Sequence, residues 1–498
     1  MEIEIIAGDI TKTKADAIIL DFFEGTKRPV GDLAGADKAL GGAISRLIGQ
    51  GEIKGKLNEA TVIHSLGKLP AARVAVVGLG KKKELSQDKV RMAVGGACRL
   101  LQQKGVASAA IVAIGAGTSG ITAEGAAQAI TEGSLLGVYS FRRHMTKEAE
   151  HGQLKQLTIV EADKAKLPAL QRGAGKGKVL AEATKLARDM VNEPANYMTP
   201  SHMAETAAKL AKDYGLEVEI LEREQMRKLG MGALLGVTQG SRQPPKLIVL
   251  RYRGGGSAKV DLALVGKGIT FDAGGISIKP PQGMEEMKSD MAGAAAVIGA
   301  IIAIAQLKPK LNVVAIAPCA ENLPSGEALK PSDVLTAING KTIEIISTDA
   351  EGRLILADAL GYANKLGAKL IVDVATLTGA MRAALGDVYS GAFGNQELVD
   401  KVIAAGTEAG EPIWQMPMPE EYKEQIKSDV ADIKNVGGKY AGSITAAQFL
   451  AEFVGDTPWV HLDIAGTGLS EKDRGYIVKG ATGVAVRILA NLALSLAK

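Results

Sequence analysis

The segment Asp261-Leu262-Ala263-Leu264-Val265-Gly266-Lys267-Gly268, residues 261–268, is the clearest structural signal in the chain. An uninterrupted apolar run that ends at a glycine and a charged residue is typical of a strand buried on both faces. Such strands belong to sheets that helices cover on both sides. Ligands bind beyond the carboxyl ends of the strands in sheets of this kind, so a functional site is expected just after residue 265.

The larger, C-terminal part of the chain repeats this strand signal between helical stretches. Long apolar helices are predicted at residues 292–306 and 354–366. Strands are predicted at residues 217–221, 246–252, 261–265, 312–317, 342–346, 370–374 and 459–464. This order predicts a central sheet covered by helices.

The N-terminal third shows the same α/β rhythm. Strands are predicted at residues 3–7, 17–20, 60–65, 74–78, 109–114 and 157–160, and helices at 86–104 and 122–139. The segment Gly115-Ala116-Gly117-Thr118-Ser119-Gly120 has the spacing of a dinucleotide-binding loop. The acidic residue expected about 20 positions later is missing, so a plain strand-turn-helix connection is the better interpretation.

A break in this pattern predicts a boundary between two domains. Residues 161–178 carry many charges, Pro168 and a run of glycine and lysine, which is typical of a linker. A helix is predicted at residues 179–191, ahead of the proline-containing segment 192–200, which is expected to be extended and rigid. We therefore expect an N-terminal domain at residues 1–175 and a C-terminal domain at residues 176–498.

Length and composition narrow the class of protein. A chain of 498 residues with 46% apolar and 23% charged residues fits a globular protein of about two to four domains. No uncharged apolar run approaches the ~20 residues of a membrane span, and the acidic start Met1-Glu2-Ile3-Glu4 is unlike a signal peptide. The two cysteines, Cys98 and Cys319, fit a reducing compartment, so we expect a cytoplasmic protein without membrane contact.

Histidine spacing and net charge narrow the chemistry. The five histidines lack the spacing of a zinc site, so a metal site must use mainly oxygen ligands. His461 lies in the predicted strand 459–464, where a packed core role is the simpler interpretation. The net charge of +4 is mild, so nucleic-acid binding is possible but is unsupported by charge.

Two carboxylates and a guanidinium stand close together in Ser347-Thr348-Asp349-Ala350-Glu351-Gly352-Arg353-Leu354, directly after the predicted strand 342–346. In an extended chain Asp349 and Glu351 point to the same side and can share a cation, whereas on a helix they diverge. A charged, solvated turn is the alternative for an arbitrary pair of this kind.

A second charged group follows the strand 261–265. The loop 266–280 is rich in glycine, which allows close approach to a ligand, and it carries Lys267, Asp272 and Lys279. Asp290 stands just ahead of the predicted helix 292–306, where an acid also serves as an ordinary helix cap.

The strand ends thus carry four acids, which repel one another unless cations compensate them. Two divalent ions would neutralise them, and a water bridging two metals becomes a nucleophile near neutral pH. Lys279 and Arg353 could then polarise a carbonyl group or hold an anion. These residues leave a hydrolase of peptides, a dinuclear phosphoesterase and a DNA-binding protein open.

These motifs resemble the leucyl (cytosol) aminopeptidases, which are dinuclear-metal exopeptidases. The resemblance covers residues 191–498 through Asn192-Glu193-Pro194, residues 266–279, Lys288-Ser289-Asp290-Met291, residues 321–326, residues 348–354 and residues 375–380. It implies an α/β/α catalytic domain with a central mixed sheet, and a smaller macro-domain-like N-terminal α/β domain that helps to assemble a homohexamer. It also implies release of N-terminal leucine or other apolar residues from peptides, by attack of a metal-bridging hydroxide on the scissile carbonyl.

The resemblance assigns roles to individual residues. It implies that two divalent ions, Mn²⁺ or Zn²⁺, are bound by Lys267, Asp272, Asp290, Asp349 and Glu351. It implies that Lys279 and Arg353 are catalytic, with a bicarbonate ion held by Arg353, near the backbone of Gly352 and Leu377, as the general base. It implies that the pocket for the N-terminal side chain is lined by Met287, Thr376, Leu377, Gly379, Ala465 and Gly468.

Three positions depart from the family pattern. Ser347 stands where the family usually has Asn, and Ala273 and Ala292 stand where Ser and Gly are common. None of them is an expected metal ligand. We expect them to affect hydrogen bonds around the site and metal preference more than the activity itself.

Overall fold

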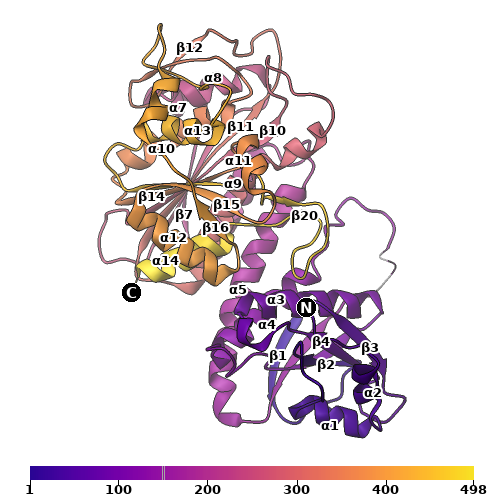
Figure 1. Ribbon diagram of the computed structural model, residues 1–498. Helices are drawn as coiled ribbons and strands as arrows, with labels where there is room; N and C mark the ends of the chain where they lie inside the picture. Colours follow the sequence, from indigo (N-terminus) through magenta and orange to yellow (C-terminus); the bar gives the residue numbers. More distant parts are fainter. Residues whose placement is uncertain (149, 151, 498) are drawn as a thin grey trace. The chain divides into compact units, whose positions relative to one another are not determined.

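The computed structural model describes residues 1–148, 150 and 152–497, and the chain divides into two compact units. The first unit comprises Met1–Glu182 and Glu471–Lys479, and the second comprises Ala183–Ser470 and Gly480–Lys498. Figure 1 shows that each unit is a sheet with helices packed against it. The prediction of two α/β domains is confirmed.

The first unit is built on a six-stranded sheet of order β1-β6-β5-β2-β4-β3. Its strands are β1 (Glu2–Ala7), β2 (Ala17–Phe22), β3 (Ala60–His64), β4 (Arg73–Gly78), β5 (Ser108–Val112) and β6 (Gln156–Glu161). All neighbouring strands are parallel except β3, which is antiparallel to β4. The predicted connection from β5 to the next helix is a plain strand-turn-helix.

Helices cover both faces of this sheet. They are α1 (Gly31–Ala39), α2 (Ala43–Gly49), α3 (Gln87–Gln103) and α4 (Ala123–Gly137). Ala17 and Ile19 of β2 share a buried cluster with α3 and α4, whereas Ile18 and Leu20 share one with α1 and α2. The period of two along the strand therefore sends alternate side chains into two separate cores.

The helix α5 (Leu167–Asn192) contradicts the predicted linker at residues 161–178. A Cβ atom on Gly173 would lie 2.0 Å from the carbonyl oxygen of Glu124, and one on Gly177 would lie 2.7 Å from that of Gln128. These glycines let α5 pack closely against α4, so they serve packing rather than flexibility. The boundary expected near residue 175 falls inside this helix, whereas the compact units divide at Glu182.

The second unit contains a nine-stranded mixed sheet of order β16-β15-β18-β14-β9-β11-β8-β7, with β10 paired to β11. Its strands are β7 (Glu217–Leu221), β8 (Lys246–Arg253), β9 (Leu262–Gly266), β10 (Gly268–Asp272), β11 (Asn312–Asn322), β14 (Leu370–Ala375), β15 (Ser390–Gly394), β16 (Ile413–Gln415) and β18 (Trp459–Asp463). Five strands of this sheet are parallel and lie side by side in the order β18-β14-β9-β11-β10. Their carboxyl ends consequently lie along one edge.

Helices lie on both faces of the second sheet. They are α6 (Pro200–Tyr214), α7 (Arg223–Leu229), α8 (Gly232–Val237), α9 (Ala292–Leu307), α10 (Glu351–Lys365), α11 (Gly379–Leu385), α12 (Gln396–Ala409), α13 (Gly442–Ala451) and α14 (Val486–Leu496). Ala263 and Val265 of β9 share a buried cluster with α8, α10 and α13. The helix α9 contacts β9 but has no residue in that cluster, so it covers the opposite face.

Two predictions about strands are corrected. Residues 342–346 do not join the central sheet, because β13 (Thr342–Glu344) belongs to a small sheet with β12 (Val334–Thr336) and β17 (Ile433–Lys434). Within the predicted loop 266–280, residues 268–272 form β10. This strand forms because β11, at 11 residues, is long enough to pair with β9 and then with β10.

One segment, Met284–Leu307, is long and apolar enough to cross a membrane by length and composition. Within the structure 89% of its most apolar window is buried. The segment contains α9, whose residues from Ala292 to Ala305 are buried in the second unit.

Candidate active site

The predicted site residues follow the ends of strands that lie side by side in the second sheet. Lys267 comes directly after β9, and Asp272 ends β10. Asp290 stands just before α9, and Glu351 is the first residue of α10. Asp272, Asp290 and Glu351 each offer a carboxylate oxygen within 4.8 Å of the others, and all three are buried. The structure therefore brings these distant residues to one point.

Two lysines connect the acids. The ammonium nitrogen of Lys267 lies 2.6 Å from Oδ2 of Asp290 and 3.0 Å from Oε1 of Glu351. The ammonium nitrogen of Lys279 lies 2.8 Å from Oδ2 of Asp272 and 2.5 Å from Oδ1 of Asp349. Asp349 is exposed and lies outside the three-carboxylate cluster, to which Lys279 joins it.

The geometry of the Asp-Ala-Glu segment differs from the extended chain that the sequence predicts. Glu351 is the first residue of α10, Ala350 is not extended (φ −116°, ψ 43°), and Asp349 stands before the helix, so the two acids do not lie on one extended segment. Glu351 reaches Lys267, and Asp349 reaches Lys279. The two acids thus contribute to the same charged network through different lysines.

Burial and crowding shift the pKa of these acids. Burial, helped by the charge of Glu351, raises the pKa of Asp272 to about 6. Burial also raises the pKa of Asp290 well above its usual range. For Glu351 the charges of Lys267 and Lys279 outweigh burial and lower its pKa. The cluster therefore holds more negative charge than its lysines neutralise, and it favours the binding of protons or other cations.

Two neutral residues hold the acids in place: Asn322, which was not among the predicted site residues, and Thr376, which was predicted only for the side-chain pocket. Asn322, the last residue of β11, donates from Nδ2 to Oδ1 of Asp272 at 2.9 Å and to the Thr348 carbonyl at 3.0 Å. The Thr376 hydroxyl donates to Oδ1 of Asp290 at 2.7 Å, and the Thr376 carbonyl accepts from Lys267 at 3.1 Å. The strand-end rule that located Asp272 also points to Asn322, which ends the neighbouring strand.

Glycine is required where the backbone of α10 meets Lys267. A Cβ atom on Gly352 would lie 2.5 Å from Cε and 2.6 Å from Nζ of Lys267. Real Cβ atoms essentially never approach other heavy atoms so closely. The first turn of α10 therefore leaves room for the buried ammonium group only because residue 352 lacks a side chain.

Arg353 is buried beside the acidic cluster. Its Nη1 donates to the Asn435 carbonyl at 2.6 Å, while its Nε has no hydrogen-bond partner among the described residues. Burial lowers the pKa of Arg353 to about 10, although the nearby carboxylates of Glu351 and Asp463 oppose this. A buried donor without a partner is costly unless it meets an acceptor, so this nitrogen favours an anionic ligand. No sequence motif around Asn435 indicated that it would contact Arg353.

The residues expected to line the side-chain pocket lie in three segments. Met287 lies three residues before Asp290, whose backbone N–H donates to the Met287 carbonyl at 3.3 Å. Thr376, Leu377 and Gly379 follow β14, and Ala465 and Gly468 follow β18. The position of a Cβ on Gly468 would lie 3.3 Å from Cγ2 of Thr376, so these two segments are in contact.

The three departures from the family pattern have defined surroundings. The Ser347 hydroxyl accepts a hydrogen bond from the backbone N–H of Asp349 at 3.3 Å, so it supports the turn that presents this acid. The Ala273 N–H donates to the Asn322 carbonyl at 2.9 Å. Ala292 packs near Gly468, with its Cβ 3.9 Å from the position of a Cβ there.

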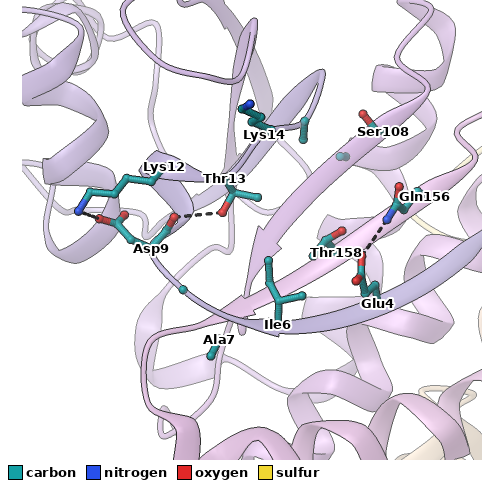
Figure 2. Close-up of a pocket in the computed structure, with 13 residues that line it drawn as sticks. Glu4, Ile6, Ala7, Asp9, Lys12, Thr13, Lys14, Ser108, Gln156 and Thr158 are labelled. Atoms are coloured by element: carbon teal, nitrogen blue, oxygen red, sulfur yellow. Dashed lines mark hydrogen bonds and ion pairs between the residues drawn. The ribbon is translucent and has the colours of Figure 1, made fainter.

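The first unit has a separate pocket of about 390 Å³, lined by parts of β1, β5 and β6 and by residues 7–15. Figure 2 shows Lys12 paired with Asp9 and Gln156 donating to Glu4. The Lys12–Asp9 distance is 3.5 Å and the Gln156–Glu4 distance is 2.9 Å. None of the sequence motifs lies in this pocket.

The covered mixed sheet carries three buried carboxylates at its strand ends, in a group that can hold a metal ion, which is the arrangement of a metal-dependent α/β enzyme. The model of the cytosol aminopeptidase family catalytic domain matches residues 185–490, and that of the N-terminal domain matches residues 19–148. A probable cytosol aminopeptidase of Alkaliphilus metalliredigens is 48% identical and one of Alkaliphilus oremlandii is 47% identical, each over 100% of both chains.

Solved structures agree with this match. The bottromycin maturation enzyme BotP in complex with Mn superposes with a TM-score of 0.86 at 34% identity, over 97% of this chain and 100% of that one. A mutant of tomato leucine aminopeptidase superposes with a TM-score of 0.88 at 34% identity, over 99% and 96% of the chains. The chain belongs to the cytosol aminopeptidase family and is an aminopeptidase.

Proposed function

We propose that the chain is a metal-dependent aminopeptidase that releases N-terminal leucine and other apolar residues from peptides. The observation that carries this proposal is the buried cluster of Asp272, Asp290 and Glu351 at the strand ends, with which Lys267 and Lys279 form ion pairs. Its family relatives are named cytosol aminopeptidases, which favours a peptide substrate over a phosphate ester.

The cluster fits two divalent ions. Four carboxylates lie within ion-pair distance of only two ammonium groups. The ligands would be Asp272, Asp290, Asp349, Glu351 and Lys267. The carboxylates raise the pKa of Lys267 against the effect of burial. As a ligand Lys267 must lose its proton, which the charge of a bound dication favours.

Carboxylate and amine donors suit Mn²⁺ or Zn²⁺. When bound, such ions act as Lewis acids and lower the pKa of water, so that it becomes a nucleophile near neutral pH. Mn is present in the complex of the relative BotP. The supporting residues Asn322 and Thr376 keep the carboxylates of Asp272 and Asp290 from rotating, because each donates a hydrogen bond to one carboxylate oxygen.

Two cationic residues have roles beyond metal binding. Lys279 is the more exposed lysine, at 20% of its side-chain surface, and its ammonium group would donate to the carbonyl oxygen of the scissile bond. Arg353 would hold a bicarbonate ion as the general base, since its buried Nε is a donor with no hydrogen-bond partner among the described residues. These assignments explain why two cations stand beside acids that bind metal.

The side-chain pocket would be lined by Met287, Thr376, Leu377, Gly379, Ala465 and Gly468. Small residues at positions 379, 465 and 468 leave room for an apolar side chain, and Met287 adapts its shape to one. We also propose a cytoplasmic homohexamer with the first unit taking part in its assembly. The names of the relatives support the cytoplasmic location, and the resemblance to the family supports the hexamer.

The test is hydrolysis of leucine p-nitroanilide after chelation and after addition of Mn²⁺ or Zn²⁺. Chelation is expected to abolish turnover and either metal to restore it, while p-nitrophenyl phosphate is not hydrolysed. Metal analysis of the restored enzyme is expected to give two ions per chain. Turnover that survives complete chelation, or hydrolysis of the phosphate ester alone, would refute the proposal.

A further inference from the structure

Asp463, the last residue of β18, connects two loops of the second unit. Its Oδ1 accepts from the backbone N–H of Leu377 at 3.2 Å and from that of Ala465 at 3.1 Å. Its Oδ2 accepts from the hydroxyl of Thr378 at 2.7 Å. The sheet register places Ala375 of β14 opposite Asp463, so one carboxylate reaches the loop after each strand.

The base of this connection is rigid. His461, two residues earlier on β18, lies 2.7 Å from Oδ1 of Asp373 through its Nδ1, and Trp459 donates to the other oxygen of Asp373 at 2.7 Å. The His461 ring stacks on Phe393 and on Trp459, with centroid distances of 6.0 Å and 6.4 Å. These packed rings and buried pairs hold the end of β18 in place.

Asp463 is itself almost fully buried, at 1% exposed. A buried carboxylate is stable only when hydrogen bonds and charges compensate it. Three donors serve it here, and the charges of His461 and Arg353 face it. If the three donors moved away, the buried carboxylate would lose all three of these hydrogen bonds, so they hold the two loops at a fixed spacing.

The loops that Asp463 joins carry much of the proposed pocket. The loop after β14 contains Thr376, whose hydroxyl and carbonyl contact Asp290 and Lys267. The loop after β18 contains Gly468, which meets Thr376 directly. Thr378 also accepts from the Met381 N–H at 3.1 Å and so caps the start of α11. Asp463 thereby joins two of the three segments that carry the expected pocket residues.

We propose that Asp463 is a positioning residue that sets the width of the side-chain pocket, and through it the preference for large apolar N-terminal residues over small ones. It does not contact the substrate. The preference rests on the proposed function, whereas the connection between the loops does not.

Asp358 of α10 provides a matched control. It is fully buried, and its two oxygens accept from the backbone N–H groups of Leu234 and Ile338, each at 2.7 Å. It therefore joins α8 to the turn at Ile338, as Asp463 joins two loops, but neither of these segments carries an expected pocket residue. Loss of either carboxylate leaves buried N–H groups unpaired, so a general loss of stability should be common to both.

The experiment compares Asp463→Ala, Asp463→Asn and Asp358→Ala in the full-length, metal-loaded enzyme. The measured quantity is the ratio of kcat/KM for leucine p-nitroanilide to that for alanine p-nitroanilide. Asp463→Ala is expected to lower this ratio about tenfold, because a widened pocket loses contact with the larger side chain. Asp463→Asn can keep two of the three hydrogen bonds and is expected to lower the ratio about threefold.

Asp358→Ala is expected to leave the ratio within about twofold of the wild-type value even where its melting temperature falls. A ratio that is unchanged in both Asp463 variants, or that falls equally in Asp358→Ala, would overturn the proposal. If Asp463→Ala does not fold, Asp463→Asn decides.

Amide hydrogen exchange without substrate supplies a readout that does not depend on hydrolysis. Faster exchange is expected at residues 376–381 and 464–468 in Asp463→Ala, and at residues 232–238 and 337–341 in Asp358→Ala. Unchanged exchange at residues 376–381 in Asp463→Ala would overturn the connection between the loops. A wild-type chain that hydrolyses neither substrate would overturn the proposed function and the pocket preference, while faster exchange there would still support the connection.

Discussion

Substitution of Gly352 by alanine should inactivate the enzyme without unfolding it. An alanine Cβ would stand 2.5 Å from Cε of Lys267, whereas carbon atoms in contact are about 3.5–4.0 Å apart. Lys267 must therefore shift by about 1 Å, which disturbs its contacts with Asp290, Glu351 and the Thr376 carbonyl. A displacement of this size within an active site costs about 100-fold in rate, or about 2.7 kcal/mol of transition-state stabilisation.

The effect on stability should be small, because two terms oppose each other. Alanine is favoured over glycine in a helix by up to about 1 kcal/mol, while overpacking costs about 1–3 kcal/mol. The assay is kcat/KM for leucine p-nitroanilide with saturating Mn²⁺, with thermal unfolding followed by circular dichroism. Gly175→Ala, in the helix α5 with nothing within 4 Å of the new Cβ, is the control. A folded Gly352→Ala enzyme with activity within about threefold of the wild type would refute the steric argument.

Two further predictions follow from the charged groups. Lys279→Ala and Asp349→Asn should each lower kcat about 100- to 1000-fold with the fold retained, because they remove the cation or the acid of one ion pair. Lys330→Ala removes the cation of an exposed ion pair and should leave kcat unchanged. Near-wild-type rates in Lys279→Ala and Asp349→Asn would contradict the assignment. Burial raises the pKa of Asp358 to about 7, although N–H groups of Leu234 and Ile338 oppose it. The folded chain therefore binds the Asp358 proton more tightly than the unfolded chain does. Protonated Asp358 adds about 4 kcal/mol to the free energy of unfolding below about pH 4, and this contribution is lost as the pH rises to about 7. Urea unfolding should be measured for the wild type and for Asp358→Asn across this pH range. The difference between their free energies of unfolding is expected to change by about 4 kcal/mol. A difference that stays constant with pH would exclude this effect.

Local sequence patterns predicted all six strands of the first sheet and six of the nine strands of the second, missing β10, β15 and β16. The strand 217–221 and the apolar helix at residue 292 are found where the pattern places them, since buried strands and helices carry their periodicity in their own residues. The glycine- and lysine-rich run at residues 173–178 was wrong as a linker. Gly173 and Gly177 are there to let α5 approach α4, and no pattern within α5 shows that partner.

The sequence was sufficient for the two α/β units and for the acids and lysines that follow the strands of the second sheet, because strand signals and strand-end residues are local. Tertiary structure was needed to show that Lys267 meets Asp290 and Glu351 while Lys279 meets Asp272 and Asp349. It also showed the supporting positions of Asn435 and Asp463. These pairings depend on the order and register of strands far apart in sequence, and packing of the whole unit sets that order.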